Sequence, residues 1–444
     1  MGRLFGTDGV RGVAGVDLTE DLATRLGRAA VVVLGRHRGS TPAFLVGRDT
    51  RRSGEDLERA LVEGIHSMGG DVIAVGVEPT PAVAFLTVVL GASSGVVISA
   101  SHNPPEYNGI KFFDAAGMKL PDELEDEIEA ALDEESPGPL TTGRWLPADA
   151  GRERYLEHLS SAAEAALDGM SVVVDCANGA ASGVAPEVLA RLGAEVHPIF
   201  AAPDGLNINV GCGALHPEVV AAEVVRLGAD AGLALDGDAD RAVFADQHGV
   251  VVDGDGVLAA CAIGMKRRGR LADDLVVTTV MANLGFHLAM REAGIRVATT
   301  QVGDRYVLEE MMRSGAMLGG EQSGHVIFRE HATTGDGLLT AVRFLSLVAA
   351  DRSTVSDVAG CMHRFPQVLV NVGVRHRDGL AEAVEVERAI AAAEAELGQA
   401  GRVLVRASGT EPIVRVMVEA EDEATASRHA EAIAQTVVRS LGAA

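Results

Sequence analysis

PAFLV (residues 42–46) is an apolar run that is followed by a helical pattern at about residues 54–68, the turn MGG (68–70) and a second run, DVIAV (71–75). An apolar run, an amphipathic helix and another apolar run are typical of a βαβ unit, whose crossover favours parallel strands. This stretch therefore predicts an α/β fold.

The same pattern occurs twice more along the chain. SVVV (171–174) and EVHPI (195–199) flank a helical pattern at about 185–192, and LVVTT (275–279) and IRVA (295–298) flank one at about 284–293. We infer a threefold repeat of α/β domains with mixed or parallel sheets. Accidental similarity among ordinary βαβ units is the alternative.

The pattern changes after about Arg364. VLVNV (368–372) and RVLVR (402–406) flank a long Ala/Glu-rich helical pattern at about 381–397, which predicts a distinct α+β domain. The predicted fold class is α/β, with three similar mixed-sheet α/β domains followed by a smaller α+β C-terminal domain, around a central cleft. The predicted boundaries are 1–150, 151–252, 253–364 and 365–444.

The composition disfavours several kinds of partner. The chain has 444 residues, with 38 Lys+Arg against 63 Asp+Glu, a net charge of −25 and only 3% aromatic residues. Repulsion between like charges disfavours nucleic acid, and few aromatic rings are present to stack on bases. The first residues lack the apolar run of a signal peptide, and no segment has the length of a membrane span. We therefore expect a cytoplasmic protein without a nucleic-acid or membrane partner.

DGDADR (236–241) follows the apolar run LAL (233–235), so Asp236, Asp238 and Asp240 emerge together at the end of a strand. Their oxygens can converge on one cation, and such ligands suit Mg²⁺, Mn²⁺ or Ca²⁺. The Gly and Glu of an EF-hand are missing at the required offsets. A solvated acidic turn is the alternative. Arg241 would suit a phosphate held against the cation.

ISASHNPP (98–105) ends another apolar run, GVVI (95–98), and places Ser101 in a loop bounded by prolines. No G-x-S-x-G elbow is present, so a hydrolase triad is poorly supported, and a phosphorylated serine bound to the metal fits better. Taken alone, the loop is equally typical of a helix cap or an Asx turn.

Two basic residues could contact an anionic substrate. GTDGVRG (6–12) places Arg11 in a glycine-rich N-terminal loop, and NGIK (108–111) places Lys111 in the connection that follows the serine loop. Isolated basic residues of this kind are more often surface charges than catalytic groups. GRDTR (47–51) is similar, and we interpret it as structural ion pairing.

Two later segments have the composition of binding loops. GGEQSGH (319–325) contains Glu321, Ser323 and His325, which can hold sugar hydroxyls or an amine; a packing role is the alternative for the histidine. RASGTEP (406–412) follows an apolar run and supplies backbone N–H groups, hydroxyls and guanidinium groups, so it predicts a phosphate site, with an ordinary polar turn as the alternative. The residues expected to contact the phosphate are Arg406, Ser408, Gly409, Thr410 and Arg415.

Taken in this order, the four motifs GTDGVRG, ASHNP, DGDADR and RASGTEP resemble those of the α-D-phosphohexomutase superfamily, and the resemblance covers essentially the whole chain. It implies an intramolecular phosphotransferase of the isomerase class that acts on a small sugar phosphate. Within the superfamily, GEQSGH (320–325), NIN (207–209) and TTQVGDRY (299–306) are similar to members that act on glucosamine phosphates.

The resemblance also implies a role for each site. Ser101 would be carried as phosphoserine, and one Mg²⁺ per subunit would be held by Asp236, Asp238, Asp240 and a phosphoserine oxygen. Glucosamine 6-phosphate would become glucosamine 1-phosphate through a glucosamine 1,6-bisphosphate, or a similar sugar bisphosphate that primes the enzyme. The product would feed the synthesis of UDP-N-acetylglucosamine and of the cell wall.

The remaining residues receive roles from the same resemblance. Lys111 and His325 would be the acid–base candidates, and Arg11 would stabilise the charge of the transferred group. Glu321 and Ser323 would hold the sugar, and the loop from Arg406 to Arg415 would hold the phosphate that does not react. The oligomeric state is left open, with a homodimer as one possibility. Phosphomannomutase or phosphoglucomutase activity, or a phosphosugar-binding module without turnover, are the alternatives.

Overall fold

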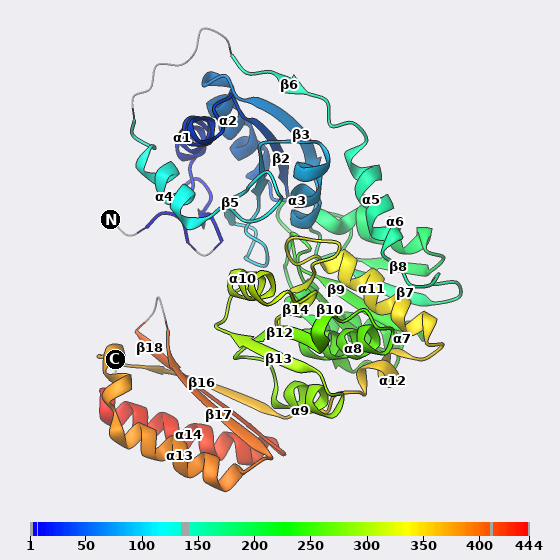
Figure 1. The fold of residues 1–444 in the computed structure, drawn as a ribbon, viewed down its shortest axis with the longest axis vertical. Helices are drawn as coiled ribbons and strands as arrows, with labels where there is room; N and C mark the ends of the chain where they lie inside the picture. The colour runs from blue at the N-terminus through cyan, green and yellow to red at the C-terminus, as the bar shows by residue number, and fades with distance from the viewer. Residues whose placement is uncertain (1–2, 7, 135–141, 409–411, 443–444) are drawn as a thin grey trace. The chain divides into compact units, whose positions relative to one another are not determined.

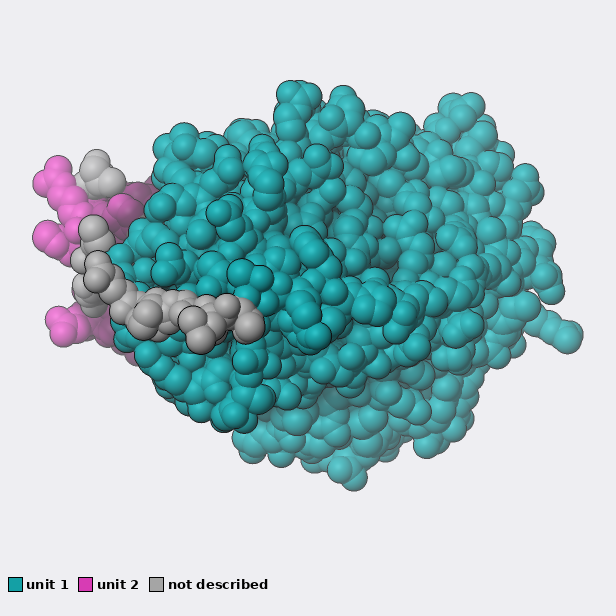
Figure 2. All heavy atoms as spheres, turned by 90° about the horizontal axis from the view of Figure 1, so that it is seen from above, with its two compact units in different colours: residues 1–281, 295–361 teal, residues 282–294, 362–444 magenta. Residues whose placement is uncertain are grey.

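The computed structural model describes residues 3–6, 8–134, 142–408 and 412–442. The chain forms two compact units, which are coloured separately in Figure 2. The first unit contains residues 1–281 and 295–361, and the second contains residues 282–294 and 362–444. Three of the four sheets lie in the first unit, and the fourth lies in the second.

The first sheet has the strand order β1-β5-β4-β2-β3-β6. Strands β4, β2, β3 and β6 run parallel to one another, whereas β5 is antiparallel to both β4 and β1. The strands are β1 (Val10–Val13), β2 (Ala43–Arg48), β3 (Asp71–Val77), β4 (Ser94–Ile98), β5 (Tyr107–Phe113) and β6 (Trp145–Leu146). The helices of this part are α1 (Glu20–Arg38), α2 (Gly54–Ser67), α3 (Thr80–Val89) and α4 (Asp122–Ala130).

Both faces of this sheet are covered, which follows from the alternation of side chains along its strands. Phe44 and Val46 of β2 enter one apolar cluster with residues of α1, α2 and α4. Leu45, between them, enters a second cluster with residues of α3. Figure 1 shows α1 and α2 side by side, with α3 apart from them. The central strands are continuous apolar runs because both of their faces pack against helices and neither is exposed.

The second sheet has the strand order β11-β10-β9-β7-β8. Strands β9, β7 and β8 are parallel, and β10 is antiparallel to its neighbours. Its strands are β7 (Ser171–Asp175), β8 (Glu195–Ile199), β9 (Ala231–Leu235), β10 (Ala242–Asp246) and β11 (Val251–Val252). The helices are α5 (Gly151–Ser161), α6 (Val184–Arg191) and α7 (Pro217–Leu227), with the 3₁₀ turns η1 (Ala180–Ser182) and η2 (Gly213–Leu215).

The third sheet has the strand order β13-β12-β14-β15, in which only β15 is antiparallel to its neighbour. Its strands are β12 (Leu275–Thr279), β13 (Arg296–Thr300), β14 (Leu318–Gly320) and β15 (Val326–Phe328). The helices are α8 (Gly254–Arg267), α9 (Leu284–Glu292), α10 (Asp304–Ser314), α11 (Gly337–Ala350) and α12 (Val355–Ala359), with the 3₁₀ turn η3 (Ala272–Asp274).

The three sheets share one core order of strands: β5-β4-β2-β3, β10-β9-β7-β8 and β15-β14-β12-β13. In each case a β-α-β-α-β run ends in a loop and returns on an antiparallel strand. The threefold repeat predicted from the sequence is therefore confirmed. The loops that end the three runs are residues 99–106, 236–241 and 321–325. These are the predicted serine, metal and sugar loops, so they occupy equivalent places in the repeat.

The second unit contains an antiparallel sheet of order β16-β18-β17, which confirms the predicted α+β domain. Figure 1 shows α13 and α14 packed on this sheet. Its elements are β16 (Gln367–Gly373), η4 (Arg377–Glu382), α13 (Val384–Leu397), β17 (Gly401–Ala407), β18 (Ile413–Ala420) and α14 (Glu423–Leu441). Helix α9 belongs to this unit by its contacts. The side chain of its N-cap residue, Asn283, donates through Nδ2 to Phe365 O and accepts through Oδ1 from Phe365 N, both at 3.0 Å.

Each sheet lies inside one of the four segments predicted from the sequence, whose boundaries stay a prediction. Among the described residues, none of the helices combines the length and the apolar character that crossing a membrane requires.

Candidate active site

Two of the equivalent loops meet in the first unit. Ser101 Oγ donates a hydrogen bond of 2.7 Å to Oδ2 of Asp236, and both side chains are buried. The serine loop and the metal loop are thus in direct contact, although they belong to different sheets. This contact joins the two features that the sequence could only place separately.

The serine loop is held by a buried arginine. Arg51, whose side chain is fully buried, donates to the carbonyl oxygens of Ser101 (3.0 Å), Asn103 (2.8 Å) and Tyr107 (2.9 Å), and also to that of Pro104. Asp49 pairs with the same guanidinium group at 2.9 Å. The ion pairing predicted for residues 47–51 is present, and it additionally builds the loop that carries the serine.

A second repeat supports the same loop. Asn209 Nδ2 donates to the carbonyl oxygens of Ser101 at 2.8 Å and Asn103 at 3.0 Å. Ser101 itself has a φ of 50°, in the left-handed region that non-glycine residues seldom adopt. Such a conformation persists only where the surroundings enforce it, and here Arg51 and Asn209 both hold the serine carbonyl.

The metal loop brings its three carboxylates together. Asp236, Asp238 and Asp240 each offer an oxygen within 4.8 Å of the others, and all three are buried. Ala239 between them has a φ of 58°, which turns the chain back toward β10. Thr80, at the start of α3, donates its hydroxyl to Asp238 Oδ2 at 2.7 Å. The structure thus confirms the prediction that the oxygens of the three aspartates lie close together.

These carboxylates suit a hard cation. Oδ1 of Asp238 and Oδ1 of Asp240 are buried and have no hydrogen-bond partner among the described residues. Burial and the neighbouring Asp240 and Asp238 carboxylates raise the pKa of Asp236 well above its ordinary value. Three buried carboxylates repel one another, and a bound cation with oxygen ligands removes that repulsion. The donor set therefore fits Mg²⁺.

Two expected basic residues lie on strands rather than in loops. Arg11 is on β1 and Lys111 is on β5. The two strands pair antiparallel, with Arg11 opposite Gly109. The expectation of loop positions was wrong because GVRG and NGIK extend the sheet by antiparallel pairing at its edge. Asp8 lies between the two cations, 3.3 Å from Arg11 and 3.5 Å from Lys111.

The ammonium group of Lys111 is stabilised where it lies. Burial alone would lower its pKa, but the carboxylates of Asp8, Asp240 and Asp238 raise the pKa above its ordinary range. Arg241 Nε lies 3.8 Å from Asp240 Oδ1. Charged donors therefore face the acidic cluster, an arrangement that suits the oxygens of a phosphate group.

His102 is a neighbour of the serine that the sequence reasoning did not single out. Its Nδ1 lies 3.2 Å from Ser101 Oγ. Burial and the cations Arg241 and Arg11 lower the pKa of His102 to about 4, so the ring is neutral near pH 7. Its position directly after the serine was the only signal available in the sequence.

The third loop, residues 321–325, is the hairpin turn between β14 and β15. Glu321 N donates to His325 O at 2.9 Å, and Glu321 Oε1 accepts a bond of 3.0 Å from Gly303 N. Gly324 has a φ of 92°, and its carbonyl accepts a bond of 3.1 Å from Ala242 N, just after the metal loop. Ser323 is exposed on the turn. The loop is thereby docked beside the acidic cluster.

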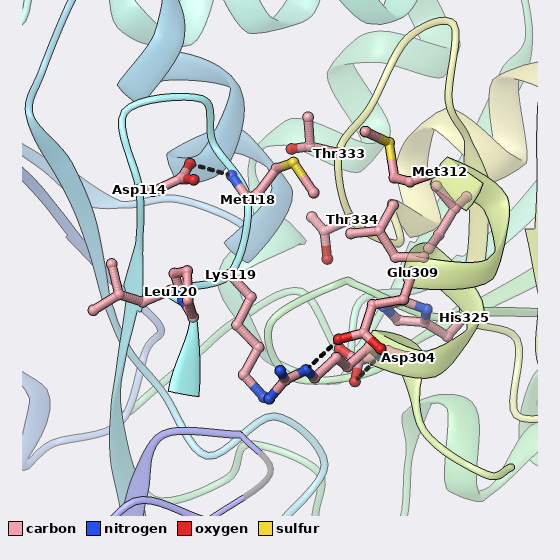
Figure 3. Close-up of a pocket in the computed structure, with 14 residues that line it drawn as sticks. Asp114, Met118, Lys119, Leu120, Asp304, Glu309, Met312, His325, Thr333 and Thr334 are labelled. Atoms are coloured by element: carbon pink, nitrogen blue, oxygen red, sulfur yellow. Dashed lines mark hydrogen bonds and ion pairs between the residues drawn. The ribbon is translucent and has the colours of Figure 1, made fainter. Parts of the chain in front are cut away.

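A cavity of about 410 Å³ adjoins this turn. Figure 3 shows His325 and Asp304 at one end of it, with Lys119 extending from the opposite loop. The wall formed by α10 includes Leu308 and Met312. The sugar loop therefore borders a space large enough for a small molecule.

The predicted phosphate loop lies in the second unit. Arg406 and Arg415 stand directly opposite each other on β17 and β18. Burial and the charge of Arg415 lower the pKa of Arg406. Like charges in this position destabilise a sheet, so the pair suits a site for an anion. Ser408 is buried and donates its backbone N–H to Ile413 O at 2.9 Å. Gly409 and Thr410 lie outside the described residues.

Sequence reasoning missed several residues that build the site. The sequence around Arg51 predicts only a structural ion pair, and Asn209 has no sequence signal beyond the resemblance of NIN (207–209). The positions of both depend on contacts between segments far apart in the chain. Asp8, in contrast, lies inside the glycine-rich motif GTDGVRG (6–12), so a sequence signal for it exists.

The chain matches family models of phosphoglucomutase/phosphomannomutase in four consecutive parts. These are the α/β/α domains I, II and III, at residues 2–138, 153–249 and 253–365, and the C-terminal domain, at residues 369–436.

Individual relatives are similar over nearly their full length. The chain is 53% identical over 449 residues to a phosphoglucosamine mutase of Desulforudis audaxviator, with 98% of each chain covered. It is 55% identical over 427 residues to a phosphoglucosamine mutase of Moorella thermoacetica, covering 95% of this chain and 96% of that protein. The crystal structure of a phosphoglucomutase/phosphomannomutase family protein from Burkholderia thailandensis aligns with a TM-score of 0.83 at 26% identity, covering 100% of this chain and 98% of that one. Both the sequence and the fold therefore place this chain in the phosphoglucomutase/phosphomannomutase family.

Proposed function

We propose that this protein is a phosphoglucosamine mutase, which interconverts glucosamine 6-phosphate and glucosamine 1-phosphate. The observation that carries the proposal is the contact of 2.7 Å between Ser101 Oγ and Asp236, inside a buried cluster of three carboxylates. A serine hydroxyl beside a cation site is suited to carrying a phosphoryl group. The choice of sugar rests on relatives at 53–55% identity that bear this name.

The reaction proceeds in two transfers. In the first, the bond between phosphorus and Ser101 Oγ breaks, and phosphorus bonds the 1-hydroxyl oxygen of glucosamine 6-phosphate. The sugar hydroxyl loses its proton and, in the net balance, Ser101 Oγ gains one. The resulting glucosamine 1,6-bisphosphate reorients and returns the phosphoryl group on its 6-oxygen to Ser101, which leaves glucosamine 1-phosphate.

The side chains supply charge and position. Asp236, Asp238 and Asp240 would hold Mg²⁺ together with a phosphoserine oxygen. When bound, this cation supplies positive charge for the phosphoryl oxygens and for the serine oxygen as it leaves. Lys111 stays protonated among carboxylates, so it can donate to the transferring group. Arg11, whose Nε is buried without a hydrogen-bond partner among the described residues, can do the same.

The remaining residues would bind the substrate. Glu321 and Ser323 would bind the sugar, and the Glu321 carboxylate would pair with the 2-ammonium group. Arg406, Ser408 and Arg415, together with Gly409 and Thr410, would bind the phosphate that does not react. Arg241, beside Asp240, would contact the phosphate held against the cation.

A substrate panel tests this proposal. The purified protein, supplied with Mg²⁺ and a catalytic amount of sugar 1,6-bisphosphate, is assayed on the 6-phosphates of glucosamine, glucose and mannose. We expect kcat/KM to be highest for glucosamine 6-phosphate. Glucose or mannose phosphates used at least as well would instead favour phosphoglucomutase or phosphomannomutase activity. Absence of turnover on all three would favour a binding module.

A further inference from the structure

The side chain of His325 accepts a hydrogen bond from a backbone amide. Gly335 N donates to His325 Nε2 at 3.2 Å, and the bond is buried. A backbone N–H can only donate, so Nε2 must present its lone pair. Protonation of Nε2 would set two N–H groups against each other and break this bond. The amide of Gly335 thus selects one protonation form of the ring.

The other ring nitrogen must then carry the proton. A neutral imidazole has one N–H, and with Nε2 unprotonated this N–H is at Nδ1. His325 is only 3% exposed, and Nδ1 is buried without a hydrogen-bond partner among the described residues. A buried donor without an acceptor is unfavourable, and a substrate oxygen would satisfy it.

Gly335 has a second effect on the ring, because it lacks a side chain. A Cβ at this position would lie 2.4 Å from both Cδ2 and Nε2 of His325 and 2.6 Å from Cε1. No real Cβ approaches ring atoms this closely, so any other residue here must displace the imidazole. The backbone φ of Gly335 is not positive, so the requirement for glycine comes from the ring and not from the backbone conformation.

We propose that Gly335 is a positioning residue that holds His325 as the neutral Nδ1–H tautomer, so that His325 donates a hydrogen bond to an oxygen of the sugar phosphate. His325 is then not the proton acceptor of the reaction. This assignment deepens the proposed function and rests on it for the identity of the ligand. The resemblance made His325 a candidate for either proton donor or proton acceptor, and the proposal keeps only the role of hydrogen-bond donor.

The tautomer can be observed directly. Two-bond ¹H–¹⁵N correlation spectra of the full chain, labelled with ¹⁵N-histidine and compared with those of His325→Asn, assign the signals of His325. We expect Nδ1 to be protonated and Nε2 to accept near pH 7. An Nε2–H tautomer or an imidazolium would overturn the proposal. This readout does not depend on which sugar phosphate the enzyme uses, so a wrong substrate assignment leaves it intact.

Two substitutions of His325 separate donation from proton acceptance. His325→Asn places an amide N–H near the position of Nδ1 but cannot accept a proton, whereas His325→Ala removes the donor. If the ring donates, we expect kcat to fall about 10- to 100-fold in the alanine variant, the cost of losing a bond to a charged group, and clearly less in the asparagine variant. Equal losses in the two variants would contradict the proposal.

A double-mutant cycle tests whether Gly335 acts through His325. Gly335→Ala is expected to lower kcat about 100-fold by displacing the ring, and to change the tautomer signals. In the His325→Ala background, the same substitution should have no further effect, because no ring remains to be displaced. Additive losses would assign Gly335 a merely structural role. Gly35→Ala, on α1, is the matched control, since its new Cβ would have no neighbour closer than 3.6 Å.

Discussion

Ser101 Oγ donates a hydrogen bond of 2.7 Å to Asp236 Oδ2 across 135 positions of sequence. The hydroxyl is therefore directed at the acidic cluster. A phosphoserine here would add negative charge beside three carboxylates, so it requires a cation.

Phosphate should be found on Ser101 and on no other residue. We expect intact-mass analysis of the protein, after incubation with sugar 1,6-bisphosphate, to show one phosphate adduct. Ser101→Ala should lack the adduct and the mutase activity, whereas Ser323→Ala, which alters the exposed hydroxyl of the sugar loop, should keep the adduct. An adduct that survives Ser101→Ala would remove this serine from the mechanism.

Removing one carboxylate should affect activity and stability in opposite directions. We expect Asp236→Asn, at the carboxylate whose pKa is raised by burial and by the other two aspartates, to lower the affinity for Mg²⁺ more than about 100-fold, since even changes around metal ligands cost up to that factor. Its metal-free form should melt at a higher temperature than metal-free wild type, because repulsion within the cluster is reduced. Activity against Mg²⁺ concentration and melting curves in chelator check both effects. Asp21→Asn, at an exposed position, is the control, and full wild-type activity in chelator would refute the metal site.

Arg51→Lys should disturb the serine loop although it keeps the charge. A lysine cannot donate to four carbonyl oxygens and to Asp49 at once. We expect a loss of at least about 2 kcal/mol in the free energy of unfolding, since buried acceptors lose their donors. The displaced serine should also lower kcat about 100-fold. Urea unfolding and steady-state kinetics measure these effects, with the exposed Arg59→Lys as control. Wild-type kcat in Arg51→Lys would contradict the positioning role.

Arg415→Leu should weaken substrate binding. Arg406 and Arg415 stand opposite each other on β17 and β18, and an anion bound between them would neutralise their like charges. We expect KM for the sugar phosphate to rise about 10- to 100-fold, the cost of a charged hydrogen bond. Arg388→Leu, an exposed arginine of the same unit, is the control. An unchanged KM would place the phosphate elsewhere.

Glu125 should make stability depend on pH. Burial raises its pKa from 4.5 to about 7, so the folded chain holds this proton while the unfolded chain releases it. Stability should therefore fall as pH rises from 4.5 to about 7, by at most about 3 kcal/mol. Glu125→Gln should abolish this part of the decline and be more stable than wild type at pH 8. Urea midpoints at pH 5 and pH 8 measure it, with the exposed Glu123→Gln on the same helix as control.

Much of the fold could be predicted from local patterns. The three βαβ units appear at the predicted places because apolar runs, amphipathic helices and glycine turns are local signals. The strand positions of Arg11 and Lys111 were not predicted. Both residues lie on strands whose pairing partner is distant in the chain, and short glycine-containing segments give a weak strand signal.

The candidate site was only partly predictable. The sequence identified Ser101, Asp236, Asp238 and Asp240 by their motifs. The tautomer of His325 could not be predicted, because it depends on the backbone amide of Gly335, ten positions away. Gly335 does not have the positive φ that would mark it as a special glycine. Arg51 likewise has an ordinary sequence context, and its importance appears only through the four carbonyl oxygens that it contacts.

The sequence by itself determined the repeat, the family and which side chains the candidate site contains, because each of these depends on short stretches of contiguous residues. The tertiary structure alone decided how those groups act together. Equivalent loops of different repeats meet only when the sheets pack. Packing buries the three aspartates of the candidate cation site, surrounds Lys111 with the carboxylates that keep it protonated, and sets the Gly335 amide against His325. Burial and distance belong to the packed chain, because both depend on residues that are remote in the sequence.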